Sequence, residues 1–548
     1  MSNLSETKQS LLDELQSRVK DKILEPSNAN LLRKFIINSD NDDEALAIAA
    51  LGTTYKRTGF HFDKRIENPR MTDTVKYLKR NKALSFGDTA EGGPSHKLII
   101  GDNYDALQNL LIQYKNQIDV IYIDPPYGKD SMGEFAKTNY HNSISRDNLL
   151  SMLYFRLELA KQLLSDKGVI LCSIDDKNQA YVKCLFDEVF GEKNFIGQLI
   201  LKTATDNNPS QITIEHEYML CYCLARKNQT KWERINRGAE LIIAKYDEIK
   251  IKGLSITEEQ KELRKWIKDN KSILKGVNHY NNIDSIGVYS SSGNSSNPHP
   301  GGYDYDIVHP ATHLACPKPA NGWRWPEETF WEYDAKGEII WGKDHSTQPH
   351  VKKRIETAVD SLRTLIYEDN RATTQMLEKI FNTKNLFSNP KPPHVLARIF
   401  DFITNEKSII LDFFAGSGTT GHAVLELNQT DRGNRTFILC QLNEKTDTTP
   451  NGIAYDVTSK RLKRIMTGEC YDGSRDFKWA KENEPYGGRL EVYEIAEVSS
   501  ACAVQGQTPF DVIDETLYGK EHFSTIQEKI EWVCSNFSHT QMYVENKY

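Results

Sequence analysis

Residues 118–127 read IDVIYIDPPY, a short apolar segment that runs directly into two prolines and a tyrosine. Residues 120–123 are apolar without alternation, which is typical of a strand buried on both faces of a parallel sheet. A similar arrangement recurs at residues 408–421, SIILDFFAGSGTTG, where an apolar strand runs into a glycine-rich turn. Because open α/β sheets bind ligands at the carboxyl ends of their strands, we expect both turns to lie at a ligand-binding edge.

Strand and helix patterns alternate around both segments. Strands are predicted at 98–100, 120–123, 169–174, 409–413 and 436–440, and helices at 106–114, 147–165 and 178–190, with a further helix ending near 427. Glycines follow two of these helices at the position where a helix commonly stops. The alternation predicts an α/β fold with a doubly wound, mostly parallel sheet.

The alternation breaks off between residues 228 and 383, a polar and aromatic stretch that contains the loop sequence SSSGNSSNPHPGG at 290–302. We therefore expect an inserted domain that divides the α/β fold. The predicted regions are a helical N-terminal region (1–95), the first half of the α/β domain (96–227), the inserted domain (228–383), the second half of the α/β domain (384–486) and a C-terminal region of unknown role (487–548).

The composition is that of an ordinary globular protein. The 548 residues are 39% hydrophobic, with a formal net charge of −7, which neither indicates nor excludes a nucleic-acid partner. The first residues have no apolar core of a signal peptide, and no run of 18 apolar residues predicts a transmembrane helix. Nine cysteines without zinc-site spacing predict reduced thiols and no metal site. We expect a cytoplasmic protein.

The first turn, Asp124-Pro125-Pro126-Tyr127, suits chemistry on an exocyclic amine. The Asp124 carboxylate and the Pro125 carbonyl can each accept one N–H bond, which would aim the nitrogen lone pair at a methyl donor. Successive prolines restrict the backbone and hold these acceptors rigidly, and Tyr127 offers a face on which a flipped-out base can stack. The alternative is an ordinary proline turn after a strand.

The second turn admits two interpretations. Residues 416–421, GSGTTG, satisfy the dinucleotide-binding fingerprint, and Glu444 follows the next strand at about the position of the acidic residue that holds a ribose. A nucleotide-binding oxidoreductase is therefore one hypothesis, and a methyltransferase is the other. A phosphate-binding loop of the Walker type is excluded, because no Gly-Lys-Ser/Thr follows. The first turn favours the methyltransferase, since an oxidoreductase has no use for Asp124 to Tyr127.

The order of the motifs resembles the beta class of DNA amino-methyltransferases, in which the catalytic half precedes the cofactor half. The resemblance is closest to the modification (Mod) subunits of Type III restriction–modification systems. The segments that carry it, besides the two turns, are IIGDNYDAL (99–107), FRLELAKQLL (155–164), GVILCSIDD (168–176), GEKNFIGQLI (191–200), HEYMLCYCLARK (216–227), GKDHSTQPHVKKR (342–354) and FSNPKPPHVLARIF (387–400). The first hundred residues match loosely and the tail hardly at all.

The resemblance implies a circularly permuted methyltransferase fold that binds S-adenosyl-L-methionine. The cofactor would lie against Phe414, Ala415, Gly416, Ser417 and Gly418, after Asp412, with Glu444 on its ribose, Asp102 and Asn103 near its adenine, and Lys391 and Pro392 beside its methionine part. Asp124, Pro125, Pro126 and Tyr127 would be catalytic. Asp102 can also be read as a helix cap, and Lys391 as a surface lysine.

The resemblance further implies site-specific methylation of adenine N6 in double-stranded DNA, because an aspartate before the prolines favours adenine in this family. Cytosine-N4 methylation is the alternative. Expected partners are DNA, a second copy of the chain and a restriction (Res) subunit with ATPase and nuclease activity. The insert would recognise the target, with interleaved aromatic and basic residues that suit DNA contact or a small aromatic core: Trp323, Arg324, Trp325, Trp331, Trp341, Lys343 and 352–354.

Overall fold

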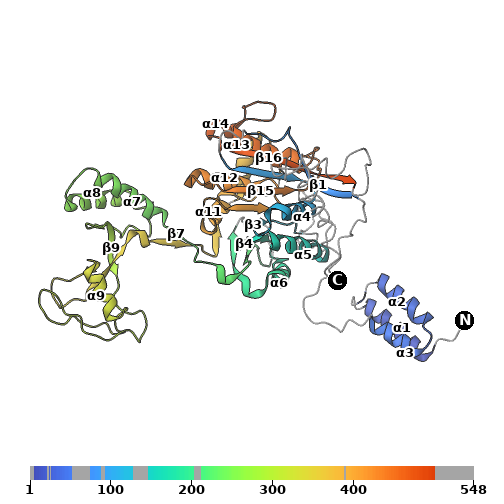
Figure 1. The fold of residues 1–548 in the computed structure, drawn as a ribbon, viewed down its shortest axis with the longest axis horizontal. Helices are drawn as coiled ribbons and strands as arrows, with labels where there is room; N and C mark the ends of the chain where they lie inside the picture. The colour runs from blue at the N-terminus through green and yellow to red at the C-terminus, as the bar shows by residue number, and fades with distance from the viewer. Residues whose placement is uncertain are drawn as a thin grey trace, which may run out of the picture.

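The computed structural model describes residues 5–20, 24, 26–51, 74–87, 93–127, 146–202, 211–368, 370–384, 386–387 and 390–499. Its centre is a ten-stranded sheet in the order β1-β16-β2-β15-β14-β3-β4-β6-β5-β13 (Figure 1). The strands in this order are Thr74–Arg80, Arg489–Ser499, Ser95–Ile100, Thr436–Gln441, Ile409–Asp412, Ile118–Ile123, Leu164–Ile174, His216–Cys223, Phe195–Lys202 and Leu365–Tyr367.

Helices cover both faces of this sheet, because its central strands are apolar on both sides. Along β3, Val120 and Tyr122 belong to one core cluster, and Ile121 and Ile123 belong to the other. The first face is covered by α10 (Asn370–Phe381), α11 (Pro393–Ile403), α12 (Thr419–Asp431) and α13 (Lys460–Thr467), with the short α14 (Lys478–Glu482). The second is covered by α4 (Asn103–Tyr114), α5 (Arg146–Leu163) and α6 (Gln179–Phe190).

The strand order reverses between β14 and β3. From β14 the chain passes through α12 to β15 on one side, and from β3 it passes through α5 to β4 on the other. The five strands from β2 to β4 in this order are parallel to one another. The predicted doubly wound, mostly parallel α/β fold is therefore confirmed, and its switch point lies between the two strands that carry the predicted turns.

The two ends of the chain differ from the predicted regions. Helices α1 (Glu6–Lys20), α2 (Pro26–Asn38) and α3 (Asp42–Leu51) do form a small helical unit around Leu15 and Ile36. However, β1 falls within 1–95 and β16 within 487–548, and the two pair with each other along the sheet edge. Sequence patterns could not reveal this pairing, because it joins segments from opposite ends of the chain. The remainder of the predicted C-terminal region, 500–548, lies outside the described residues.

The insert is narrower than predicted. It is joined to the sheet domain by a two-stranded neck, β7 (Glu233–Ile235) with β12 (Val359–Ser361), and forms a lobe beyond it (Figure 1). The prediction of 228–383 was wrong at its end, since β13 extends the main sheet and α10 packs on its core. The lobe consists of α7 (Arg237–Lys250), α8 (Ile256–Asp269), β8 (Asn282–Ile283), β9 (Val288–Gly293), α9 (Glu327–Ala335), β10 (Ile339–Ile340) and β11 (His350–Arg354).

Most of the aromatic residues of the insert serve its own core. Trp323 is buried with Phe330 and Val351, and the Trp341 indole donates to the Asp334 carboxylate at 2.8 Å. Trp331 is more exposed and lies against Trp341. The sequence alternative of a small aromatic core therefore describes these residues better than a stacked DNA surface does. Every helix in the described ranges is too short or too polar to span a membrane.

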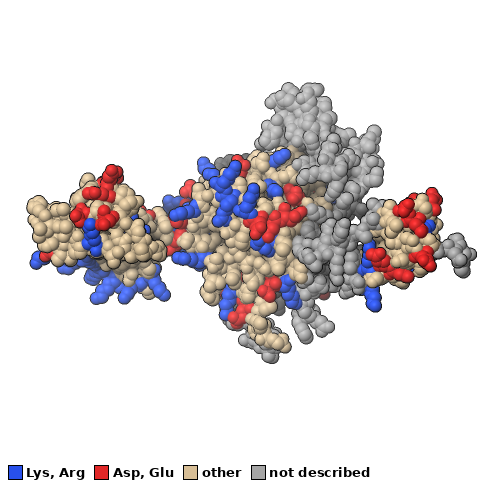
Figure 2. All heavy atoms as spheres, turned by 90° about the horizontal axis from the view of Figure 1, so that it is seen from below, with Lys and Arg blue, Asp and Glu red and all other residues tan. Residues whose placement is uncertain are grey.

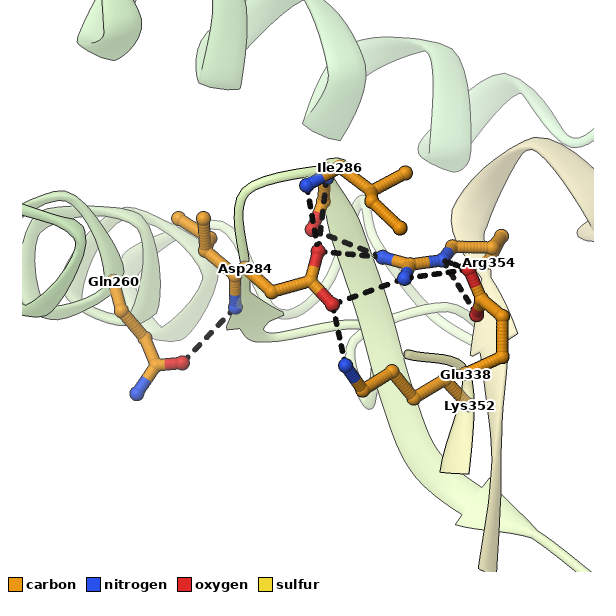
Figure 3. A network of polar contacts seen from close by, with 8 residues as sticks. Gln260, Asp284, Ile286, Glu338, Lys352 and Arg354 are labelled. Carbon is orange, nitrogen blue, oxygen red and sulfur yellow. Dashed lines mark hydrogen bonds and ion pairs between the residues drawn. The ribbon is translucent and has the colours of Figure 1, made fainter. Parts of the chain in front are cut away.

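Two of the three basic residues at 352–354 are held in an ion-pair network (Figure 3). Lys352 Nζ lies 2.6 Å from Asp284 Oδ2, and Arg354 bridges Asp284 at 2.8 Å to Glu338 at 2.8 Å. Partial burial raises the pKa of Asp284, but hydrogen bonds from Arg354 and Lys352 outweigh this effect and hold the pKa below its usual range. Lys353, on the other face of β11, is exposed. Of the three, Lys353 is the one for which the described residues provide no ion pair.

We predict that Asp284→Ala destabilises the insert by about 2 kcal/mol, because two largely buried cations lose their shared carboxylate. Thermal unfolding and amide hydrogen exchange across 282–361 measure the effect. Asp304→Ala is the matched control, since Asp304 also pairs with a lysine, Lys318 at 2.6 Å, but is 81% exposed and should change neither measurement. Equal effects of the two variants would contradict the structural role of the network.

Candidate active site

The carboxyl ends of four neighbouring strands carry the predicted site residues. Asp102 and Asn103 follow β2, Glu444 follows β15, the glycine turn follows β14, and Asp124 follows β3. Strands β14 and β3 are hydrogen-bonded to each other, with Ile410 opposite Val120. The two turns therefore lie side by side at the switch point, although they are separated by almost three hundred residues in the sequence.

The glycine turn is shaped by the backbone of Gly416 and Gly418, whose φ angles of 52° and 81° favour glycine. Gly418 is also the N-cap of α12, so the turn leads directly into a helix N-terminus. The Asp412 carboxylate accepts from the Phe414 amide at 2.9 Å and from the Thr420 hydroxyl at 2.5 Å. Burial raises the pKa of Asp412 to about 7. The turn therefore carries an aspartate that changes charge near neutral pH.

Three side chains that the sequence did not single out fix this turn from behind. Gln441 Oε1 accepts from the Gly416 amide at 2.6 Å, and the Thr458 hydroxyl donates to the Gly416 carbonyl at 2.6 Å. The buried Arg461 guanidinium donates to the Ser417 hydroxyl at 2.9 Å. Thr458 lies in a π-helical turn, Ala454–Ser459, a rare geometry that places it against the loop. No local sequence signal marks these residues.

Asp102 is a helix cap, as one of its two sequence interpretations predicted, and both Asp102 and Asn103 lie beside the glycine turn. Asp102 caps α4 by accepting from the Tyr104 amide at 2.8 Å, and it pairs with the buried Arg156 at 3.2 Å. Asn103 donates to the Phe413 carbonyl at 2.7 Å, which ties the end of β2 to the glycine turn. The predicted neighbours of the cofactor therefore lie beside the turn, and Glu444 stands three residues past the end of β15.

The turn after β3 is held by contacts from three elements. The Tyr127 hydroxyl donates to Asp124 Oδ1 at 2.9 Å, and Asn178, the N-cap of α6, donates to the Tyr127 carbonyl at 2.8 Å. Lys391, just before α11, lies 3.6 Å from Asp124 Oδ1 and donates to the Tyr127 hydroxyl at 3.0 Å. Pro125 is buried and Pro126 half-buried. Lys391 is therefore a residue of the site, and the surface-lysine alternative is excluded.

Glu217 is the main residue of this site that sequence reasoning missed. It lies near the start of β6, forms a close ion pair with Lys391, and lies 3.5 Å from the Tyr127 hydroxyl. Burial is the main cause that raises the pKa of Asp124, and Lys391 acts against it while Glu217 adds to it. The residue stands in the segment 216–227 that carries the family resemblance, but nothing in that segment indicates which carboxylate reaches the site.

The residues of this edge fit S-adenosylmethionine by their chemistry. Carboxylates at Asp102 and Asp124 follow the two strands β2 and β3 on either side of the strands that carry the glycine turn and Glu444, as suits a ligand with a positively charged sulfur and amine. A carboxylate after β15, Glu444, suits a ribose diol. In the described part of the chain, no group of three or more His, Cys, Asp or Glu side chains could hold a metal ion.

Comparisons with known proteins agree with this geometry. The N6/N4 DNA methylase family matches residues 118–446, and a family of uncharacterised conserved proteins matches residues 4–120. The EcoP15I Mod subunit of a Type III restriction–modification enzyme from Escherichia coli is 32% identical over 71% of this chain and 67% of its own. The StyLTI Mod subunit from Salmonella typhimurium is 32% identical over 65% and 54%, and the Type II methyltransferase M.KpnI from Klebsiella pneumoniae is 30% identical over 71% and 90%.

Among solved structures, the cytosine-N4-specific PvuII DNA methyltransferase aligns over 70% of this chain and 96% of its own, with 10% identity and a TM-score of 0.32, too low to inform the site. The family match covers more than half of the chain and includes both predicted turns. The predicted enzyme class and cofactor are thereby confirmed, and the oxidoreductase hypothesis is set aside. This chain belongs to the N6/N4 DNA methylase family and is an S-adenosylmethionine-dependent DNA methyltransferase.

Proposed function

We propose that this protein methylates the N6 amine of a flipped-out adenine in double-stranded DNA, at one short sequence. The observation that carries the proposal is the position of Asp124, beside the glycine turn at the switch point and with one oxygen engaged by Tyr127. Among the described residues, the contacts of this carboxylate with Tyr127 and Lys391 both involve Oδ1, which leaves Oδ2 as the second acceptor. It is therefore available for an N–H of the target base.

The residues of the site act on the amine by orientation and charge. Asp124 and the Pro125 carbonyl accept the two N–H groups, which directs the nitrogen lone pair away from the ring, and the face of Tyr127 receives the flipped base. When bound, S-adenosylmethionine supplies an electrophilic methyl group. Because burial raises its pKa, Asp124 is a suitable acceptor for the proton that the amine loses. Glu444, Asp102 and Lys391 are the proposed contacts of the cofactor's ribose, adenine and methionine parts.

The proposal extends to the biological setting. Similarity to the EcoP15I and StyLTI Mod subunits supports a modification subunit of a Type III system, acting as a homodimer together with a separate Res subunit. The insert is the proposed recognition domain, because it forms a separate lobe on a neck that extends from the sheet domain (Figure 1). Lys and Arg side chains gather along one edge of this lobe (Figure 2), as phosphate contact requires. The exposed Lys353, Lys343 and Arg324 are candidate contacts.

The first test is expression of the full chain in a host free of DNA methylation, followed by sequencing that reads base modifications directly. We expect N6-methyladenine at one recurrent motif. N4-methylcytosine at a recurrent motif would replace the proposal with the alternative reaction, which the same fold supports. Unmodified DNA, together with protein that still binds S-adenosylmethionine, would contradict the proposal that this chain modifies DNA by itself.

We predict that Asp124→Ala lowers the rate of methylation by about 10²-fold to 10⁴-fold, because the amine loses its charged acceptor. The affinity for S-adenosylmethionine, measured by calorimetry, should change little. Asp166→Ala is the control, since this exposed aspartate lies at the opposite end of the neighbouring strand β4 and should leave both quantities unchanged. Parallel loss of rate and cofactor affinity in Asp124→Ala would assign the residue a structural role.

We predict the reverse pattern for Gly418→Asp, which should weaken cofactor binding by about tenfold or more. At a φ of +81° a side chain is strained, and the new Cβ would lie 3.3 Å from Thr458 Cγ2 at the cofactor turn. Gly473→Asp is the matched control, because Gly473 has the same φ of +81° but has no atom within 4 Å of the added Cβ. Normal binding by Gly418→Asp would contradict the placement of the cofactor.

A further inference from the structure

Glu217 has no role in the reaction as proposed above, although it lies within the site. Strand β6 pairs antiparallel with β4, with Tyr218 opposite Ile174, so that Glu217 is brought to the carboxyl end of β4 and close to the end of β3. Its side chain is 15% exposed, and that of Lys391 is 14% exposed. A carboxylate so deeply placed needs a partner, and it has one in Lys391.

One cation is therefore shared between two carboxylates. Lys391 forms its close ion pair with Glu217, whereas its distance to Asp124 Oδ1 is 3.6 Å, longer than a hydrogen bond. The Tyr127 hydroxyl lies between them, accepting from Lys391 at 3.0 Å and donating to Asp124 at 2.9 Å. The sequence of contacts runs from Glu217 through Lys391 and Tyr127 to Asp124.

The relative strength of the two ion pairs of Lys391 determines how basic Asp124 is. Two opposite charges in contact attract each other more strongly in a protein interior than in water, enough to fix the partner of a buried lysine. Without Glu217, Asp124 would be the nearest remaining carboxylate for Lys391. A shorter Lys391–Asp124 pair would stabilise the Asp124 charge further and lower its basicity.

We propose that Glu217 is a positioning residue that draws Lys391 into the closer of its two ion pairs, leaves the pair with Asp124 long, and so keeps Asp124 basic enough to accept the amine. The proposal rests on the proposed function, since it concerns the acceptor in that reaction. Glu217 touches no reacting atom and acts through Lys391 and Tyr127.

Other groups near Asp124 must be considered in any pH measurement. Lys391 and Glu217 face it from the segment before α11 and from β6, Tyr127 from its own turn, Tyr122 from β3, Cys172 from β4 and Asp412 from β14. The two tyrosines and the cysteine are neutral near pH 7, because burial raises the pKa of each. Asp412 titrates near neutrality, so each variant must be compared with the parent chain, in which Asp412 is the same.

The test is the pH dependence of kcat at saturating cofactor and DNA for the full chain and for variants of the pair. In E217Q the loss of a negative charge lowers the pKa of Asp124, so the acid limb should move to lower pH by about one unit, and the plateau should fall about tenfold. In K391M the loss of a positive charge raises that pKa, so the acid limb should move to higher pH. E217D keeps the charge and should return the limb toward that of the parent chain.

Opposite shifts of the acid limb, with the KM for DNA nearly constant, would support the proposal, because a merely structural role cannot move the limb in two directions. An unshifted limb in both E217Q and K391M would overturn it, as would shifts in the same direction. K391M and E217D provide the decision if E217Q does not fold. Failure of the parent chain to methylate adenine would instead overturn the proposed function, so the two failures are distinguishable.

Discussion

The site depends on the hydrogen-bonded pairing of β14 with β3 in the middle of the sheet. Both strands are buried on both faces, so their register is fixed by packing, and the turns that follow them come to lie together. The helices and strands that continue from each turn diverge in opposite directions, the arrangement that forms the ligand-binding edge of open α/β sheets. The prolines make the turn at Asp124 rigid. Glycine at position 418 allows the positive φ of the other turn and a close approach of the cofactor to its backbone.

Helix α11 connects this site to the inserted domain. Lys391 precedes its N-terminus, and its C-terminal residues are held by Arg234 of the neck, which lies 3.1 Å from Asp401 Oδ1 and donates to the Thr404 carbonyl at 2.9 Å. The same helix packs along α12, whose N-terminus is the glycine turn. Helix α11 therefore contacts the neck at one end and carries the shared lysine at the other, and it lies along the helix that begins at the cofactor turn. The insert is thus joined to the catalytic site through this helix.

The sequence predicted the centre of the fold because the information there is local. The unbroken apolar run before Asp124 predicts a buried strand, and the glycine spacing after Asp412 predicts a turn that leads into a helix. Both elements are found at these positions in the sheet domain. Contacts between distant segments were not predictable in this way. Glu217 and Lys391 are 174 residues apart, and the edge pairing of β1 with β16 joins the two ends of the chain. The ion pairs of the basic run at 352–354 were not predictable for the same reason. Lys352 pairs with Asp284 and Arg354 with Glu338, and no sequence pattern links these residues.

Negative charge at the catalytic edge affects cofactor binding and methyl transfer in opposite ways. A carboxylate such as Asp102 suits the binding of a cationic cofactor, but a field that only stabilises the cation would also hold back methyl transfer, since positive charge moves to the amine nitrogen. Asp124 resolves the conflict in the proposed reaction because it lies where the new charge develops, and so stabilises the transition state more than the bound cofactor. That benefit is lost if a lysine neutralises Asp124 beforehand. The proposed reaction therefore requires a second carboxylate that competes with Asp124 for Lys391, and Glu217 is the carboxylate that forms the closer pair with this lysine.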